Sequence, residues 1–230
     1  QLSSRLAFIG SGNMANALIS GLLAAGTCAR ERIIASDVRA DALVDFAKRH
    51  GIETSADNRE AVRTADVIVL ATKPQVLAAA LSQLAPAIAK DALLISIAAG
   101  VPLSAIERRL QSGARVIRAM PNTPALVQAG ATAIAAGSAA HAADMDVAQT
   151  IFETVGIVGN RGARQIAGAR PLDLDHVGAV VRQHLRGART HHDGAAGCRP
   201  AGESGAARGG RAGPAGLPAP RASRRTASRR

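Results

Sequence analysis

Apolar residues first gather at positions 6–9 (L-A-F-I), and they recur at helical spacing a few residues later. A short continuous apolar run is typical of a strand buried on both faces. Ala17, Leu18 and Leu22 then fall on one face of a helix with a period near 3.6 residues. The segment G-S-G-N-M lies between the two patterns. The order therefore predicts a buried strand, a glycine turn and a helix.

The same alternation of apolar runs and helical stretches continues along the chain. Strands are expected at residues 32–36, 65–71, 93–97 and 115–119, a helix over residues 40–50, and a further helix that begins at Pro74. Strands that alternate with helices predict an α/β fold. We expect a Rossmann-like, doubly wound and mainly parallel sheet.

The glycine turn predicts a dinucleotide site. Gly10 permits the tight turn, Gly12 lets a pyrophosphate approach the backbone, and Ala15 takes the third glycine's place, where the helix packs on the strand. A helix N-terminus attracts phosphate. The loop comprises Gly10, Ser11, Gly12, Asn13, Met14 and Ala15. The alternative is a glycine turn that only packs.

The end of the second strand bears on the choice of cofactor. Asp37 lies 25 positions after Gly12, where a carboxylate can accept hydrogen bonds from ribose hydroxyls, which favours NAD(H). Ser36 and Arg39 flank it, and an arginine there suits the 2′-phosphate of NADP(H). The preference stays open, and Asp37 is alternatively only the N-cap of the helix over residues 40–50.

Three further strand ends reach the edge where ligands bind in open α/β sheets. Lys73 is expected to face the cofactor, or to be an ordinary solvated lysine. Arg118 is expected either to form a structural charge pair or to contact an anion. The segments that follow the strands are Ala71, Thr72, Lys73 and Pro74, then Ile97, Ala98 and Ala99, and then a loop stiffened by two prolines, Met120, Pro121, Asn122, Thr123 and Pro124.

Four motifs together resemble one known family. I-G-S-G-N-M-A, A-T-K-P-Q, S-I-A-A-G-V and R-A-M-P-N-T-P-A-L-V-Q-A-G-A-T occur in the order and spacing of pyrroline-5-carboxylate reductase. The resemblance covers roughly residues 6–159 and implies a helix at residues 142–154 and a strand at residues 156–158. The family passes hydride from NAD(P)H to a cyclic imine, 1-pyrroline-5-carboxylate, and so makes L-proline.

The resemblance also implies roles for single residues. The glycine loop holds the pyrophosphate, whereas Ser36, Arg39 and Asn58 lie near the adenosine ribose. Residues 71–74 and 97–99 flank the nicotinamide, and residues 120–124 lie on the substrate side. Thr72 stands where the family usually has Val, a near-isosteric change that we do not expect to matter. No side chain in residues 1–160 is identified as proton donor, and the catalytic residues are unknown.

The chain changes character after residue 160. Residues 161–230 contain 14 Arg, 15 Ala, 12 Gly and 5 Pro, with no Phe, Tyr, Trp, Met, Lys or Asn. Such a segment cannot bury enough apolar surface to offset its chain entropy, so we expect a largely disordered tail. In the family a helical dimerisation domain stands here, so we expect a monomeric chain with impaired activity. We predict a dinucleotide-binding domain at residues 1–160 and a tail at 161–230.

The positive charge of the chain belongs to that tail. Residues 161–230 carry 14 Arg against 4 acidic residues, whereas residues 1–160 carry 14 basic and 13 acidic residues. An Arg-rich tail predicts at most non-specific binding to nucleic acid. Arg, Ala, Gly and Pro also have GC-rich codons, and we favour an out-of-frame reading of a GC-rich gene over a natural low-complexity tail.

Other classes of protein fit less well. No run of eighteen apolar residues exists, and residues 1–5 are too short for a signal peptide, so we expect a cytoplasmic protein without a membrane span. Cys28 and Cys198 form neither a disulfide framework nor a metal site. Two alternative functions stay open: a non-catalytic dinucleotide-binding module with a basic tail, and a reductase of the beta-hydroxyacid dehydrogenase type, which needs a lysine that the tail lacks.

Overall fold

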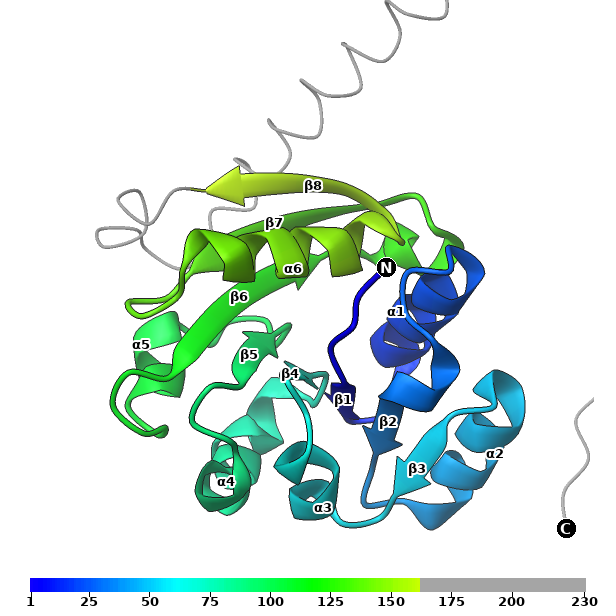
Figure 1. The fold of residues 1–230 in the computed structure, drawn as a ribbon, viewed down its shortest axis with the longest axis horizontal. Coiled ribbons are helices and arrows are strands. Elements are labelled where there is room, and N and C mark those ends of the chain that lie inside the picture. The colour runs from blue at the N-terminus through cyan, green and yellow to red at the C-terminus, as the bar shows by residue number, and fades with distance from the viewer. Residues whose placement is uncertain (162–230) are drawn as a thin grey trace, which may run out of the picture.

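Eight strands form one sheet in the described part of the chain (Figure 1). The computed structural model describes residues 1–161, with the backbone alone at positions 160 and 161, so the expectations for the tail lie outside the described residues. The strands are β1 (Leu6–Ile9), β2 (Ile33–Ser36), β3 (Glu53–Ser55), β4 (Val67–Leu70), β5 (Leu93–Ser96), β6 (Arg115–Pro121), β7 (Gly130–Ala136) and β8 (Gly156–Arg161).

The strand order is that of a doubly wound sheet. It runs β3-β2-β1-β4-β5-β6-β7-β8, and of these pairs only β6 with β7 is antiparallel. The chain leaves β1 toward β2 on one side and returns to β4 on the other. This change of direction creates the crevice at the carboxyl ends of the strands where such sheets bind ligands. The predicted fold class is confirmed.

Within residues 1–161, six α-helices cover the two faces of the sheet, as Figure 1 shows. One face packs against α1, α2 and α6, and it buries Phe8, Leu18 and Phe152. The other face packs against α3, α4 and α5, and it buries Ile68 and Leu81. The helices are α1 (Asn13–Ala24), α2 (Ala40–His50), α3 (Asn58–Arg63), α4 (Pro74–Leu84), α5 (Leu103–Glu107) and α6 (Ala142–Glu153).

Several element boundaries differ from the sequence-based expectation. Arg32 closes a short 3-10 turn (Arg30–Arg32) ahead of β2. The last described strand, β8, runs beyond the expected residues 156–158. The three-residue strand β3 was not expected, because its sequence E-T-S has no apolar pattern and Glu53 is exposed. Neither was β7, whose alanine-rich sequence lacks a clear alternation of apolar and polar residues.

The proline-flanked loop also begins later than expected. Met120 and Pro121 are the last residues of β6 and pair with Ala133 and Thr132 of β7, so the prediction that they are loop residues was wrong. The pairing of β5 with β6 stops at Arg118. Beyond that point β6 has a ladder partner on one side only, which is a position where a strand tolerates proline. Thr123 and Pro124 open a 3-10 turn, η3 (Thr123–Val127).

Candidate functional site

The turn between β1 and α1 needs glycine at position 10. Gly10 has φ +103°, a conformation that L side chains rarely adopt, and its N–H donates to the Ser36 carbonyl oxygen. A Cβ at Gly10 would lie 2.9 Å from the Ala71 carbonyl oxygen and 3.3 Å from the Thr72 nitrogen. The turn is therefore packed tightly against the end of β4.

Position 12 needs glycine for a different reason. Gly12 has φ −76° and ψ −179°, which any residue can adopt, and a Cβ built there would have no atom within 4 Å. Gly12 is the N-cap of α1, and no side chain caps that helix end. Neither backbone strain nor packing thus requires a glycine here. The first N–H groups of the helix have no side-chain cap, and the space beside Gly12 is open. Open space beside free N–H groups fits a phosphate.

Asp37 ties the glycine loop to the end of β2. Its Oδ2 accepts hydrogen bonds from the Ser11 N–H and hydroxyl, and its Oδ1 accepts them from the Arg39 N–H and Nε–H. Burial raises the pKa of Asp37, but these hydrogen bonds outweigh it and leave the pKa below its ordinary value. The alternative that Asp37 is the N-cap of α2 was wrong, because Arg39 holds that position.

Ser36 and Asn58 meet beside this loop. Ser36 is fully buried at the end of β2, and its hydroxyl donates to the Asn58 Oδ1 at 2.7 Å. Asn58 is the first residue of α3, which Asp57 caps through the Arg59 N–H. The residues expected near the adenosine ribose therefore come together, although sequence spacing alone did not predict that these two side chains bond to each other.

The carboxyl ends of β4 and β5 bring the next two expected segments to the same edge. Pro74 opens α4, as expected, and Lys73 stands exposed at its N-cap. The Thr72 hydroxyl is buried and has no hydrogen-bond partner among the described residues. After β5, Ile97 donates its N–H to the Leu70 carbonyl oxygen. The next residue, Ala98, is buried and has a small side chain. The end of β4 lies against the glycine turn through Ala71, and the hydrogen bond from Ile97 to Leu70 places the end of β5 next to β4.

The segment after β6 is held by its own hydrogen bonds. The Asn122 Oδ1 accepts the Ala131 N–H at 2.8 Å, and the Asn122 carbonyl oxygen accepts the Ala125 N–H. The following turn, η3, packs against α1. Asn122 therefore fixes the course of this segment by accepting hydrogen bonds from two backbone N–H groups.

Arg118 is a candidate whose surroundings the sequence could not supply. Its Nε is buried without a hydrogen-bond partner, and no ion pair within residues 1–161 includes it. Burial lowers the pKa of its guanidinium. Of the two expectations for this residue, the structural charge pair is not found in the described part of the chain. The signal in the sequence was an arginine between the apolar residues Ile117 and Ala119 of the expected strand.

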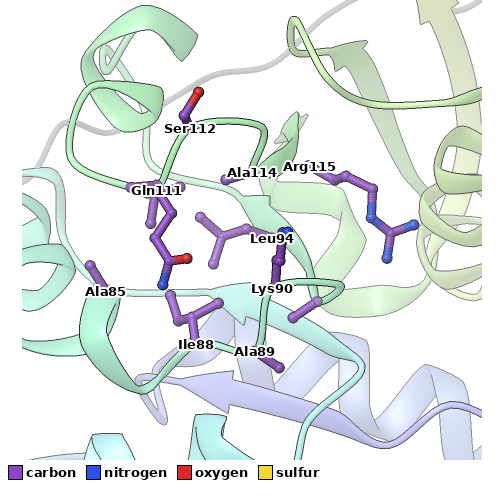
Figure 2. A pocket seen from close by; sticks show the side chains of 11 residues that line it. Ala85, Ile88, Ala89, Lys90, Leu94, Gln111, Ser112, Ala114 and Arg115 are labelled. Atoms are coloured by element: carbon purple, nitrogen blue, oxygen red, sulfur yellow. The ribbon is translucent and has the colours of Figure 1, made fainter.

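A separate pocket lies at the opposite edge of the sheet. Figure 2 shows Lys90, Gln111 and Arg115 around it, and its walls come from the segments that precede β5 and β6. Arg115 is already paired with Asp144 at 2.7 Å. Because β5 and β6 run parallel to β1, this pocket lies away from the glycine loop and holds none of the expected site residues.

Residues 1–161 contain neither a metal-binding cluster nor a membrane-spanning helix. No group of three His, Cys, Asp or Glu side chains there could hold a metal ion. The described helices include none with the length and apolar character needed to span a membrane.

Comparisons with known proteins give a matching family model and curated relatives. A family described as NADP oxidoreductase, coenzyme F420-dependent, matches residues 5–100. The pyrroline-5-carboxylate reductase of Methanosarcina acetivorans is 45% identical over 154 residues, which is 67% of this chain and 57% of the relative. This chain thus spans little more than half the length of that curated relative.

Two solved structures of pyrroline-5-carboxylate reductases are similar to this chain. The structure of a pyrroline-5-carboxylate reductase from Coxiella burnetii matches with a TM-score of 0.68 and 33% identity, and the match covers 84% of this chain and 72% of that one. The Plasmodium falciparum pyrroline carboxylate reductase with NADP bound has a TM-score of 0.63 at 21% identity, over 84% of this chain and 80% of that one. At this identity the second likeness concerns the fold alone.

Proposed function

Because this chain belongs to the pyrroline-5-carboxylate reductase family, we propose that it carries the cofactor-binding domain for the NAD(P)H-dependent reduction of 1-pyrroline-5-carboxylate to L-proline. The domain comprises residues 1–160. The small-molecule substrate and the cytoplasmic location remain predictions from the sequence.

One observation carries the proposal. Gly12 lies at an uncapped helix N-terminus with no atom within 4 Å of an added Cβ, in a conformation that does not itself call for glycine. A glycine that the protein does not need for its own packing is explained by a ligand that approaches the backbone closely. The pyrophosphate of a dinucleotide is such a ligand.

The remaining cofactor contacts are assigned by position. Ser36, Asp37, Arg39 and Asn58 surround the adenosine ribose. The glycine loop holds the pyrophosphate through Gly10, Ser11, Gly12, Asn13, Met14 and Ala15, and the nicotinamide side is formed by Ala71, Thr72, Lys73, Pro74, Ile97, Ala98 and Ala99. We propose either NADP(H) or NAD(H) as cofactor, and the description of the matching family model, an NADP oxidoreductase, supports the first.

The chemistry requires mainly positioning. When bound, the reduced nicotinamide would supply a hydride to the carbon of the protonated imine, whose C=N bond becomes the C–N bond of the proline amine. The residues of this chain hold the dinucleotide across the sheet edge, and Met120, Pro121, Asn122, Thr123 and Pro124 stand on the substrate side. Binding holds the two reactants in a fixed geometry and so removes their translational and rotational entropy before the reaction. The barrier of the chemical step is therefore lower. We assign no proton donor among residues 1–160.

A titration paired with an assay tests the proposal. The full chain is titrated with NADPH and with NADH, and proline formation from 1-pyrroline-5-carboxylate is followed in parallel. Binding with measurable turnover supports the reductase. Binding with little turnover is the result expected of the cofactor-binding domain alone. A chain that stays inactive after a helical dimerisation domain has been restored supports instead a non-catalytic dinucleotide-binding module. The absence of binding by either cofactor contradicts the assigned domain.

A further inference from the structure

Two buried side-chain atoms have no hydrogen-bond partner in the described part of the chain, and both lie at the carboxyl edge of the sheet. They are the Thr72 Oγ1 and the Arg118 Nε. A buried polar atom without a partner costs about 1–3 kcal/mol, so native structures hold few of them. Because both atoms lie at the sheet edge that carries the glycine loop, a bound ligand is a natural partner for them.

Thr72 stands directly against the glycine turn. Its backbone nitrogen lies 3.3 Å from the position that a Gly10 Cβ would take. It follows β4, whose last residue Leu70 is paired with Ser96 of β5. The Thr72 backbone thus lies next to the loop assigned to the pyrophosphate, at the end of the strand that neighbours β5.

Arg118 lies on the other side of β5. It is paired with Ser96 in the sheet, so Leu70, Ser96 and Arg118 form one row across β4, β5 and β6. Val116, two residues earlier on β6, belongs to the core on the α4 and α5 side, and Arg118 projects toward the same face. β4 and β6 are two strand spacings apart, about 10 Å.

These two groups bracket the end of β5, where the residues are small. Ala98 and Ala99 follow β5, and Ala98 is 2% exposed. Thr72, two residues beyond Leu70 of this row, therefore offers a hydroxyl on one side of the end of β5, Arg118 offers a guanidinium on the other, and the residues between them have small side chains. A flat group with oxygen atoms at its rim fits this arrangement, because both side chains can donate hydrogen bonds.

We propose that Thr72 and Arg118 together bind oxygen atoms of the nicotinamide half of the dinucleotide, on either side of the end of β5. The inference rests on the proposed function. It adds a hydroxyl contact and a cationic contact that the glycine loop does not provide, and it explains why the Thr72 Oγ1 and the Arg118 Nε are buried without partners within residues 1–161. It departs from the expectation that Thr72 in place of the family's usual Val has no consequence.

Binding measurements on isosteric variants test the proposal. Thr72→Val removes only the hydroxyl, and Arg118→Met removes the charge and the donors. We expect Thr72→Val to weaken binding of NADPH or NADH, whichever the full chain prefers, by about two- to tenfold, and Arg118→Met by about ten- to a hundredfold. The adenosine half alone (2′,5′-ADP for NADPH, AMP for NADH), measured by competition, should bind all variants equally.

The thermal midpoint of the free chain gives a second readout. Thr72→Val should raise it while lowering cofactor affinity, because the variant no longer buries an unpartnered hydroxyl. A hydroxyl with a purely structural role would not give opposite changes. Thr150→Val on the exposed side of α6 and Arg109→Met after α5 serve as matched controls, and both should leave cofactor affinity unchanged. Arg118→Lys replaces Arg118→Met if the latter does not fold.

Three results would overturn the inference. They are unchanged affinity in either variant, an equal loss for the dinucleotide and for its adenosine half, and a loss in the control variants of the same size. Failure of the unmodified chain to bind any dinucleotide would instead contradict the proposed function, so the two failures are distinguishable.

Discussion

Ser11 donates both its backbone N–H and its hydroxyl to one oxygen of Asp37, at 2.9 and 2.8 Å. The other oxygen of Asp37 accepts two hydrogen bonds from Arg39. All four bonds join the glycine loop, the end of β2 and the start of α2 through one half-buried carboxylate. Asp37 thus has a structural role in the protein that does not depend on a bound ribose.

The first prediction concerns the pH dependence of stability. The pKa of Asp37 is lowered in the folded chain, so its stabilising contribution is complete above its ordinary pKa of about 3.9 and is lost as the pH falls through the lowered value. Asp37→Asn should therefore reduce the free energy of unfolding at pH 7, and the difference from the unmodified chain should shrink at pH 3. Denaturant unfolding at both pH values measures it, with Asp41→Asn on exposed α2 surface as control.

The second prediction concerns the glycine loop. Gly12→Val should weaken binding of NADPH or NADH at least tenfold, about 1.4 kcal/mol, because a branched side chain would fill the space beside the helix N-terminus. The free chain has room for that side chain, since no atom lies within 4 Å of an added Cβ. The unfolding midpoint should therefore change little. Unchanged affinity in this variant would refute the pyrophosphate site.

The third prediction concerns the choice between cofactors. The Arg39 side chain is 61% exposed and contacts Asp37 at 3.4 Å, so it can also reach a 2′-phosphate. Arg39→Ala should weaken NADPH binding by about 1.5–3 kcal/mol, the value of a charge-assisted contact, and leave NADH binding nearly unchanged. Parallel titrations measure the two affinities. An equal loss for both cofactors would leave Arg39 without a role in the discrimination.

The fourth prediction concerns a glycine inside α1. Helix propensity alone says that Gly21→Ala stabilises by about 1 kcal/mol. A Cβ at Gly21 would, however, lie 2.7 Å from the Thr154 carbonyl oxygen and 3.0 Å from Val155 Cγ1. Backbone at the end of α6 cannot move away cheaply, so we expect net destabilisation. Thermal unfolding measures the sign, with Ala24→Gly at the end of the same helix as a control that should destabilise through propensity.

The fifth prediction concerns the whole chain. Residues 161–230 lack the apolar periodicity of an interface core, so the chain should be monomeric and should form little proline. Light scattering and a turnover assay measure the two properties. A reading frame that encodes a helical dimerisation domain after codon 160 should restore both. Brisk proline formation by the 230-residue chain would contradict the interpretation of the tail.

The sequence by itself determined the elements whose signals are local. The apolar run L-A-F-I, the glycine turn and the periodic residues of α1 predicted the first strand–helix unit, and Pro74 marked the start of α4. Buried parallel strands have continuous apolar runs, and helix starts have their own residue preferences, so both can be recognised within a few neighbouring positions. Once these elements were predicted, the ends of the strands at the ligand-binding edge of the sheet could be predicted as well.

Tertiary structure decided what depends on residues far apart in the chain. The strand β7 and the extension of β6 through Pro121 arise from pairing across the sheet, because an alanine-rich segment becomes a strand only when a neighbour supplies its hydrogen bonds. Gly21 requires glycine because the end of α6 lies against it. The bonds of Asp37 with Ser11, 26 positions away, have the same origin, as does the Arg118 Nε that is buried without a partner within residues 1–161. Residue type says which contacts a side chain can make, whereas only the packed fold decides which of those partners it meets.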